Sequence, residues 1–95
     1  MKIAELKRGM SNVSVEGKVI DKSETRNVMT RFGMREVATA LIEDDSGRIN
    51  LTLWGKQINE IEIGNKVRIS GAFVTEFREE LQLNVPKSGK IKVLE

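Results

Sequence analysis

The chain has 95 residues, 39% hydrophobic and 32% charged, and a net charge of +2, which predicts one globular domain over residues 1–95. Because it contains neither cysteine nor histidine, it lacks disulfides, thiolate nucleophiles, the commonest general base and the commonest transition-metal ligand, so we expect no catalytic residue, metal or cofactor. No apolar run approaches the roughly 20 residues of a membrane span, and charged residues interrupt the N-terminal apolar segment, so we expect a cytoplasmic protein without membrane contact.

Apolar residues recur with period two along most of the chain, which predicts strands and not long helices. Before the first strand, Ile3, Leu6 and Met10 stand at near-helical spacing and are expected to close one end of the fold. The first strand covers residues 13–20. Gly17 within it suits a sharp bend or a close approach of another backbone.

A polar loop is expected from residue 23 to about 33, followed by a second strand over residues 35–43. That strand is semi-apolar on both faces, so its register stays open. Asp44 to Gly47 carry the residue types of a tight turn into a third strand that ends at Trp54. In this third strand the aliphatic residues face the core on alternate positions, namely Ile49, Leu51 and Leu53.

One or two helical turns are predicted over residues 57–61, before a fourth strand over residues 66–75. Simple alternation along this strand would bury Phe73. A β-bulge at Gly71 would shift the phase by one residue, exposing Phe73 and burying Val74, and glycine within a strand is a common bulge signal.

A charged loop is expected over residues 76–80, then a fifth strand over residues 81–85. Pro86 restricts pairing, and a bend at residues 88–89 precedes a last apolar segment. Five strands with a short helix between the third and fourth predict an all-β Greek-key barrel of the OB-fold type.

Trp54, the only tryptophan, lies on the polar side of its strand, together with Arg48, Asn50 and Thr52. An exposed flat aromatic ring in polar company is suited to stacking on a nucleobase. Capping of the barrel or a subunit contact is the alternative explanation. Basic residues also concentrate over residues 22–35 and 87–92, where they could contact phosphates or simply keep the surface hydrated.

Over nearly its whole length the chain resembles the archaeal single-domain single-stranded DNA-binding proteins, and it is similar to the DNA-binding OB folds of replication protein A. Each matching stretch alone is a weak signal, but together they are fairly specific. The stretches are Leu6-Lys7-Arg8-Gly9-Met10 before Val13-Ser14-Val15, Asp45-Ser46-Gly47-Arg48, Leu51-Thr52-Leu53-Trp54-Gly55-Lys56 and Leu81-Gln82-Leu83-Asn84.

The resemblance implies base stacking by Trp54, Phe73 and Phe77, and it supports the bulge at Gly71. Phe32 is expected either to fold over the bound strand or to pin its own loop. Candidates for phosphate or base-edge contacts are Arg48, Lys56, Arg26, Arg31, Arg35, Arg78 and Lys87. Candidates for further polar contacts are Asn50, Thr52, Gln82 and Asn84.

The predicted function is sequence-independent binding of single-stranded DNA, about 4 to 6 nucleotides per domain, in replication, repair or recombination. We expect a monomeric, nucleoid-associated protein, with replication or repair proteins as further partners. The acidic residues within 76–80 depart from the family pattern and weaken the electrostatic support for Phe77.

Three alternative functions belong to other classes of protein. An RNA- or tRNA-binding OB module would have the same barrel, and a protein-interaction scaffold would cover Trp54 with another chain. A metal-dependent nuclease would have to use Glu43-Asp44-Asp45, but the turn explains both aspartates and neighbouring strand positions point apart. The chain is therefore predicted to be a binding module and not an enzyme.

Overall fold

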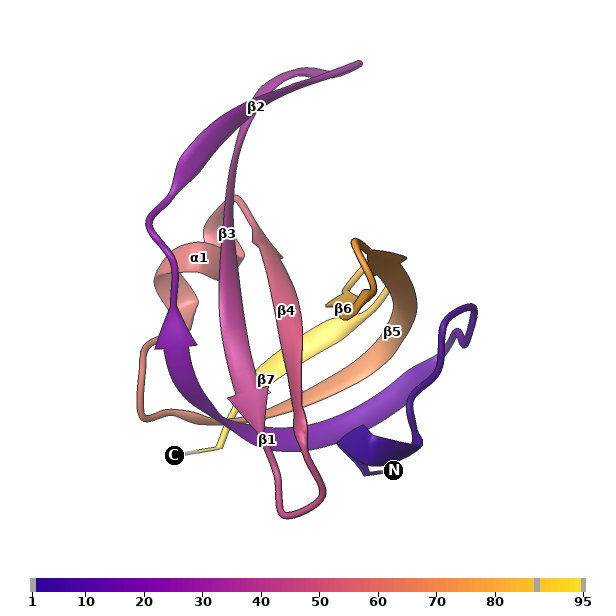
Figure 1. Ribbon diagram of the computed structural model, residues 1–95. Helices are drawn as coiled ribbons and strands as arrows, with labels where there is room; N and C mark the ends of the chain where they lie inside the picture. The colour runs from indigo at the N-terminus through magenta and orange to yellow at the C-terminus, as the bar shows by residue number, and fades with distance from the viewer. Residues whose placement is uncertain (1, 87, 95) are drawn as a thin grey trace.

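The computed structural model describes residues 2–86 and 88–94 and shows one curved sheet that closes into a barrel (Figure 1). The strands follow the order β1-β3-β4-β6-β5-β7, and a further pairing of β1 with β5 completes a ring of five strands. The predicted all-β barrel with one short helix is confirmed. The elements are η1 (Ile3–Glu5), β1 (Val13–Lys22), β2 (Arg26–Thr30), β3 (Gly33–Glu43), β4 (Arg48–Trp54), α1 (Lys56–Glu60), β5 (Lys66–Phe77), β6 (Glu80–Asn84) and β7 (Lys90–Val93).

The core is formed by the inward residues of the alternating strands, as predicted. The aliphatic residues of β4 that were assigned to the interior are buried, and so are the alternating valines of β1. Gly17 marks a close approach, because a Cβ there would lie 3.0 Å from the carbonyl oxygen of Glu43. The open register of β3 is settled by its pairing with β4: Ala38, Ala40 and Ile42 face the core, and the intervening residues face outward.

The predicted bulge at Gly71 is present in β5. Val13 and Val15 of β1 pair with Ala72 and Ile69, so two steps along β1 match three along β5. Gly71 itself has a φ of +69°, a conformation that glycine adopts without a steric penalty. The phase shift leaves Val74 2% exposed and Phe73 38% exposed.

The predicted loop over residues 23–33 is wrong in its conformation. Residues of β2 pair in register with the first half of β3, from Arg26 opposite Val37 to Thr30 opposite Gly33. The resulting hairpin extends beyond the barrel (Figure 1). Sequence periodicity alone did not reveal β2, because an exposed hairpin needs no buried face and so carries little apolar alternation.

The predicted charged loop over residues 76–80 is also wrong. Strand β5 continues to Phe77, which pairs with Glu80 of β6. Only Arg78 and Glu79 lie between them, and both have positive φ values, as a two-residue hairpin turn of type I′ requires. Phe77 therefore sits on a strand and is positioned by the sheet.

The two ends of the chain complete the barrel. Ile3 and Leu6 are buried and Met10 packs against the core, which confirms that the N-terminal segment closes one end, although only one 3₁₀ turn forms there. Near the C-terminus, β6 ends one residue earlier than predicted, at Asn84. The last apolar segment is β7, which pairs with β5 and has no strand on its other side among the described residues.

The turn between β3 and β4 is organised by Asp44. Its carboxylate accepts hydrogen bonds from the Ser46 hydroxyl and from the backbone N–H groups of Ile3, Ser46 and Gly47, at 2.6 to 3.1 Å. Desolvation acts to raise the pKa of Asp44, but these hydrogen bonds outweigh it and lower the pKa to about 2. The turn explains this aspartate, as the sequence indicated.

Acid should weaken the fold through this carboxylate. Because its pKa is depressed in the folded chain, the stabilisation is complete above the ordinary value of 3.8 and is lost as the pH falls from there toward 2. After allowance for solvent screening, we expect Asp44→Asn to lower the free energy of unfolding by about 1 kcal/mol at pH 7 and by much less near pH 2. Urea unfolding of both proteins across this range would measure it, and equal losses at all pH values would contradict it.

Candidate nucleic-acid interface

The outer face of β3, β4, β6 and β5 gathers most of the predicted contact residues. Cross-strand pairing places Thr39, Thr52, Asn84 and Phe73 in one row. A second row consists of Leu41, Asn50, Gln82 and Thr75. The three outward residues of β3 (Val37, Thr39 and Leu41) were not predicted, because sequence alone left the register of that strand open.

A groove lies at the end of β4, between the β2–β3 hairpin and the segment after β6. The groove is open to solvent and has a volume of about 910 Å³. Its lining combines two aromatic residues, three cations and several small or polar residues: Thr30, Arg31, Phe32, Arg35, Trp54, Gly55, Lys56, Gln57, Val85, Pro86 and Gly89. The structure thus unites Phe32, Trp54, Arg31, Arg35 and Lys56, which the sequence could only list separately.

Trp54 is half-buried at the last position of β4. Its backbone N–H donates to Oε1 of Gln57 (3.1 Å), and the next N–H, that of Gly55, donates to the carbonyl oxygen of Glu36 (3.0 Å). Gly55 turns the chain into α1 with φ +53° and ψ −118°, a combination that residues with a Cβ avoid. The strand partner of Trp54 is Val37, which is only 3% exposed although it faces outward.

The tip of the β2–β3 hairpin is held by Thr30. Its hydroxyl donates to the carbonyl oxygen of Gly33 (2.9 Å) and accepts from the N–H of Phe32 (3.1 Å). The Phe32 side chain remains 81% exposed beside the groove. The pairing of Arg26 with Val37 places Arg26 on the groove side of the same hairpin. Met29 and Met34 form an exposed pair on the opposite side, which the sequence pattern did not indicate.

Phe73 and Phe77 form a second aromatic group on β5. Both are exposed, Phe77 by 59%, and the guanidinium carbon of Arg78 lies 5.2 Å from the centre of the Phe77 ring. This is cation–π distance, so one face of that ring is already covered. Because β6 separates β5 from β4, strand spacings place the Cα atoms of Phe73 and Trp54 about 12 Å apart.

The two ends of this face differ in charge. The end near Trp54 carries the groove cations, whereas Arg48 lies at the opposite end of β4, where its Nε donates to the Glu43 carboxylate (2.6 Å). The hairpin around Phe77 adds Glu79 and Glu80, whereas Glu76 alternates to the other side of β5 and pairs with Arg8 (3.7 Å). Arg48 is therefore not brought to the groove, and its charge is largely balanced.

The polar candidates are mostly engaged within the sheet. Asn50 donates to the Glu80 carboxylate (3.3 Å), and Asn84 donates to the Thr75 hydroxyl (2.9 Å). Thr52 is buried and Gln82 is half-buried. The remaining candidate, Lys87, lies outside the described residues.

The acidic run considered for a nuclease has other partners. Glu43 pairs with Arg48, Asp44 organises its turn, and Asp45 pairs with Lys2 (2.5 Å). No cluster of acidic side chains suited to a metal ion occurs within residues 2–86 and 88–94. In the same part of the chain, no helix has the length and apolar character needed to cross a membrane.

Known proteins place this barrel in a family. The sequence model of the protein family described as OB-fold nucleic acid binding domain matches residues 13–94. The chain therefore belongs to this family. That membership confirms the predicted binding module, as opposed to an enzyme.

Among individual relatives, the chain is 39% identical over 90 residues to the single-stranded DNA binding protein Ssb of Saccharolobus solfataricus. That match covers 95% of this chain and 61% of the relative, so the chain spans less than two thirds of the relative's length. The resemblance to archaeal single-stranded DNA-binding proteins is confirmed.

Solved structures show the same fold. The OB domain of Ta0387 from Thermoplasma acidophilum superposes with a TM-score of 0.87 at 29% identity, covering 100% of this chain and 86% of that one. The replication factor A related protein from Methanobacterium thermoautotrophicum gives a TM-score of 0.83 at 24% identity, covering 100% and 90%.

Proposed function

We propose that this protein binds single-stranded DNA without sequence preference, as a monomer, and protects it during replication, repair or recombination. The observation that carries the proposal is the groove in which Trp54 and Phe32 stand among Arg31, Arg35 and Lys56. The 39% identity to a single-stranded DNA binding protein supports it.

The proposed mechanism combines stacking with charge. Every base has a π face, so stacking on Trp54 and Phe32 contributes on the order of 1 to 3 kcal/mol per base whatever the sequence. Groove cations release counterions from the phosphates, which makes binding salt-dependent. A duplex hides its base faces, so the aromatic residues favour single strands.

Phe73 and Phe77 extend the proposed platform across the sheet. Phe73 has polar neighbours, and a base can stack directly on its exposed ring. A base reaches Phe77 either on the ring face opposite Arg78 or by displacing that guanidinium, which can then contact a phosphate. The acidic residues around this hairpin weaken that end of the site, so the groove at Trp54 contributes most of the affinity.

Titration of the intrinsic Trp54 fluorescence tests this function. Oligo-dT of about 6 nucleotides should quench the emission strongly, a duplex long enough to stay base-paired should not, and quenching should weaken as salt rises. Oligo-U serves as the RNA competitor. Unchanged emission with every ligand would refute base stacking on Trp54, and tighter binding of RNA would assign the site to RNA.

The hairpin cations should set much of the salt dependence. Changing both Arg31 and Arg35 to Gln is expected to weaken oligo-dT binding about tenfold and to reduce the slope of log K against log salt by about 1.4, or about 0.7 per lost phosphate contact. Changing both to Lys should preserve that slope, because the charge remains. Fluorescence anisotropy of labelled oligo-dT at several salt concentrations measures both quantities, and an unchanged slope in the Gln variant would contradict the assignment.

A further inference from the structure

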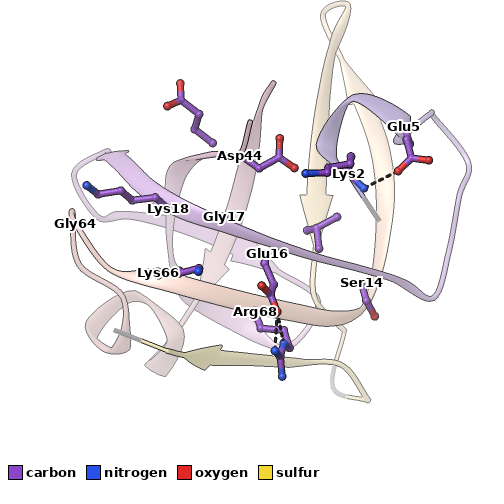
Figure 2. A pocket seen from close by; sticks show the side chains of 12 residues that line it. Lys2, Glu5, Ser14, Glu16, Gly17, Lys18, Asp44, Gly64, Lys66 and Arg68 are labelled. Carbon is purple, nitrogen blue, oxygen red and sulfur yellow. Dashed lines mark hydrogen bonds and ion pairs between the residues drawn. The ribbon is translucent and has the colours of Figure 1, made fainter. Parts of the chain in front are cut away.

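A second basic surface lies away from the aromatic face, where β1, β5 and β7 run side by side. Its five cations are Lys18, Lys66, Arg68, Lys90 and Lys92. The register places Lys18 directly opposite Lys66, and Arg68 directly opposite Lys92. On their other sides, Lys18 is opposite Glu43 and Arg68 is opposite Glu16. Figure 2 shows the Lys18 and Lys66 side chains on neighbouring strands beside the shallow depression that they help to line. Like charges at directly paired positions repel each other, so this arrangement favours an anionic ligand.

Only one of these cations forms an ion pair among the described residues. Glu16 accepts from Nε and Nη2 of Arg68 at 2.7 and 2.6 Å, and hydrogen bonding from Arg68 lowers the pKa of that carboxyl group (Figure 2). Three further carboxylates border the depression and have partners outside the basic surface. Glu43 is paired with Arg48, Asp44 organises its turn, and Glu5 accepts from the backbone N–H of Lys2. Among residues 2–86 and 88–94, no ion pair involves Lys18, Lys66, Lys90 or Lys92. The surface therefore keeps an unbalanced positive charge.

Strand β5 connects this surface to the aromatic face. Its first half presents Lys66 and Arg68 outward, and its second half presents Phe73 and Phe77 outward. Because of the bulge at Gly71, the side chains of both groups point outward. Lys90 of β7 pairs with Ser70, which lies between the two groups on β5. Phe73 follows Lys66 by seven positions, which corresponds to roughly 20 Å along the strand.

We propose that the basic surface on β1, β5 and β7 binds the phosphate backbone of a single strand that continues beyond the aromatic face. This rests on the proposed function. The surface carries no aromatic side chain, since Trp54 and the three phenylalanines lie elsewhere, so it contacts phosphates and leaves the bases unread. A strand whose nucleotides all lie on the aromatic residues does not extend to it: about 20 Å requires about 6 further nucleotides at the 3.4 Å spacing of stacked bases, and about half that number in a fully extended strand.

Oligonucleotide length separates this second contact from the first. We would compare wild type with the double variant Lys66→Gln and Lys92→Gln on oligo-dT of about 6 and about 15 nucleotides, with DNA in excess. The variant should bind the short strand like wild type. It should bind the long strand roughly 3- to 10-fold more weakly, with a salt slope shallower by about 1.4.

The double variant Lys66→Arg and Lys92→Arg is the matched control, since it keeps both charges and should bind both lengths like wild type. Equal affinities of the Gln variant and wild type for the long strand would overturn the proposal, as would equal weakening at both lengths. Failure of wild type to bind the short strand would instead refute the proposed function. The proposed phosphate contact on β1, β5 and β7 would then be refuted as well. Normal short-strand binding by the Gln variant also shows that it is folded.

Discussion

Replacing Trp54 by alanine should weaken binding of single-stranded DNA by roughly 5- to 150-fold, the equivalent of about 1 to 3 kcal/mol for one stacked base. Trp54 has the largest ring in the groove, and it stands on a strand end whose backbone is fixed by hydrogen bonds to Gln57 and Glu36. Because the backbone is fixed before binding, only the side-chain torsions of Trp54 are left to be ordered on contact with a base. Because the variant lacks tryptophan, the anisotropy of a labelled oligo-dT is the appropriate measurement.

Two controls separate stacking from stability. Trp54→Phe keeps a smaller ring and should recover part of the affinity, and thermal unfolding will show whether uncovering Val37 has weakened the fold. Met29→Ala removes an exposed apolar side chain from the opposite side of the hairpin and should leave binding unchanged. A Trp54→Ala protein that is folded and binds like wild type would remove Trp54 from the site.

Gly71→Ala should have the largest effect on the fold, lowering the free energy of unfolding by about 3 kcal/mol. Part of this is the penalty of about 1 to 2 kcal/mol for a Cβ in the left-handed region, at φ +69°. The remainder arises because that Cβ would lie 3.0 Å from the Cα of Gly89, where backbone and not a flexible side chain must move.

Gly64→Ala is the matched control for Gly71→Ala. Gly64 also has a positive φ, +99°, but no atom lies within 4 Å of the position that a Cβ would occupy, so only the conformational penalty of about 1 to 2 kcal/mol is expected. Urea denaturation of both variants measures the difference. Equal losses would mean that the contact with Gly89 relaxes at no cost.

The bulge also links the fold to the proposed site. Without the extra residue at Gly71, the alternation of β5 would turn Phe73 toward the core and Val74 toward solvent. Gly71→Ala should therefore reduce oligo-dT affinity if it turns Phe73 away from the surface. If the alternation of β5 is preserved, the affinity should stay unchanged. Affinity measured under conditions where the variant is fully folded tests this connection.

The strands that form the barrel were predictable from the amino-acid sequence because each buries one face. Burial imposes a period of two, and this period located β1, β4 and the inner residues of β5. The turn at Asp44 and the bulge at Gly71 were predictable because their conformations select particular residue types. Trp54 could be singled out because it interrupts the polar side of an otherwise regular strand.

Other features depended on pairing between distant segments, which local patterns do not encode. The β2–β3 hairpin has no buried face, so its exposed residues gave no period, and only its pairing brings Phe32 and Arg35 beside Trp54. Arg48 is close to Trp54 in sequence, but six residues of strand carry it to the other end of β4 and beside Glu43. The residue types of the site were thus readable from local chemistry, whereas their division into a basic groove, an acidic hairpin and a second basic surface was decided by sheet register, because register alone determines which distant side chains share a face.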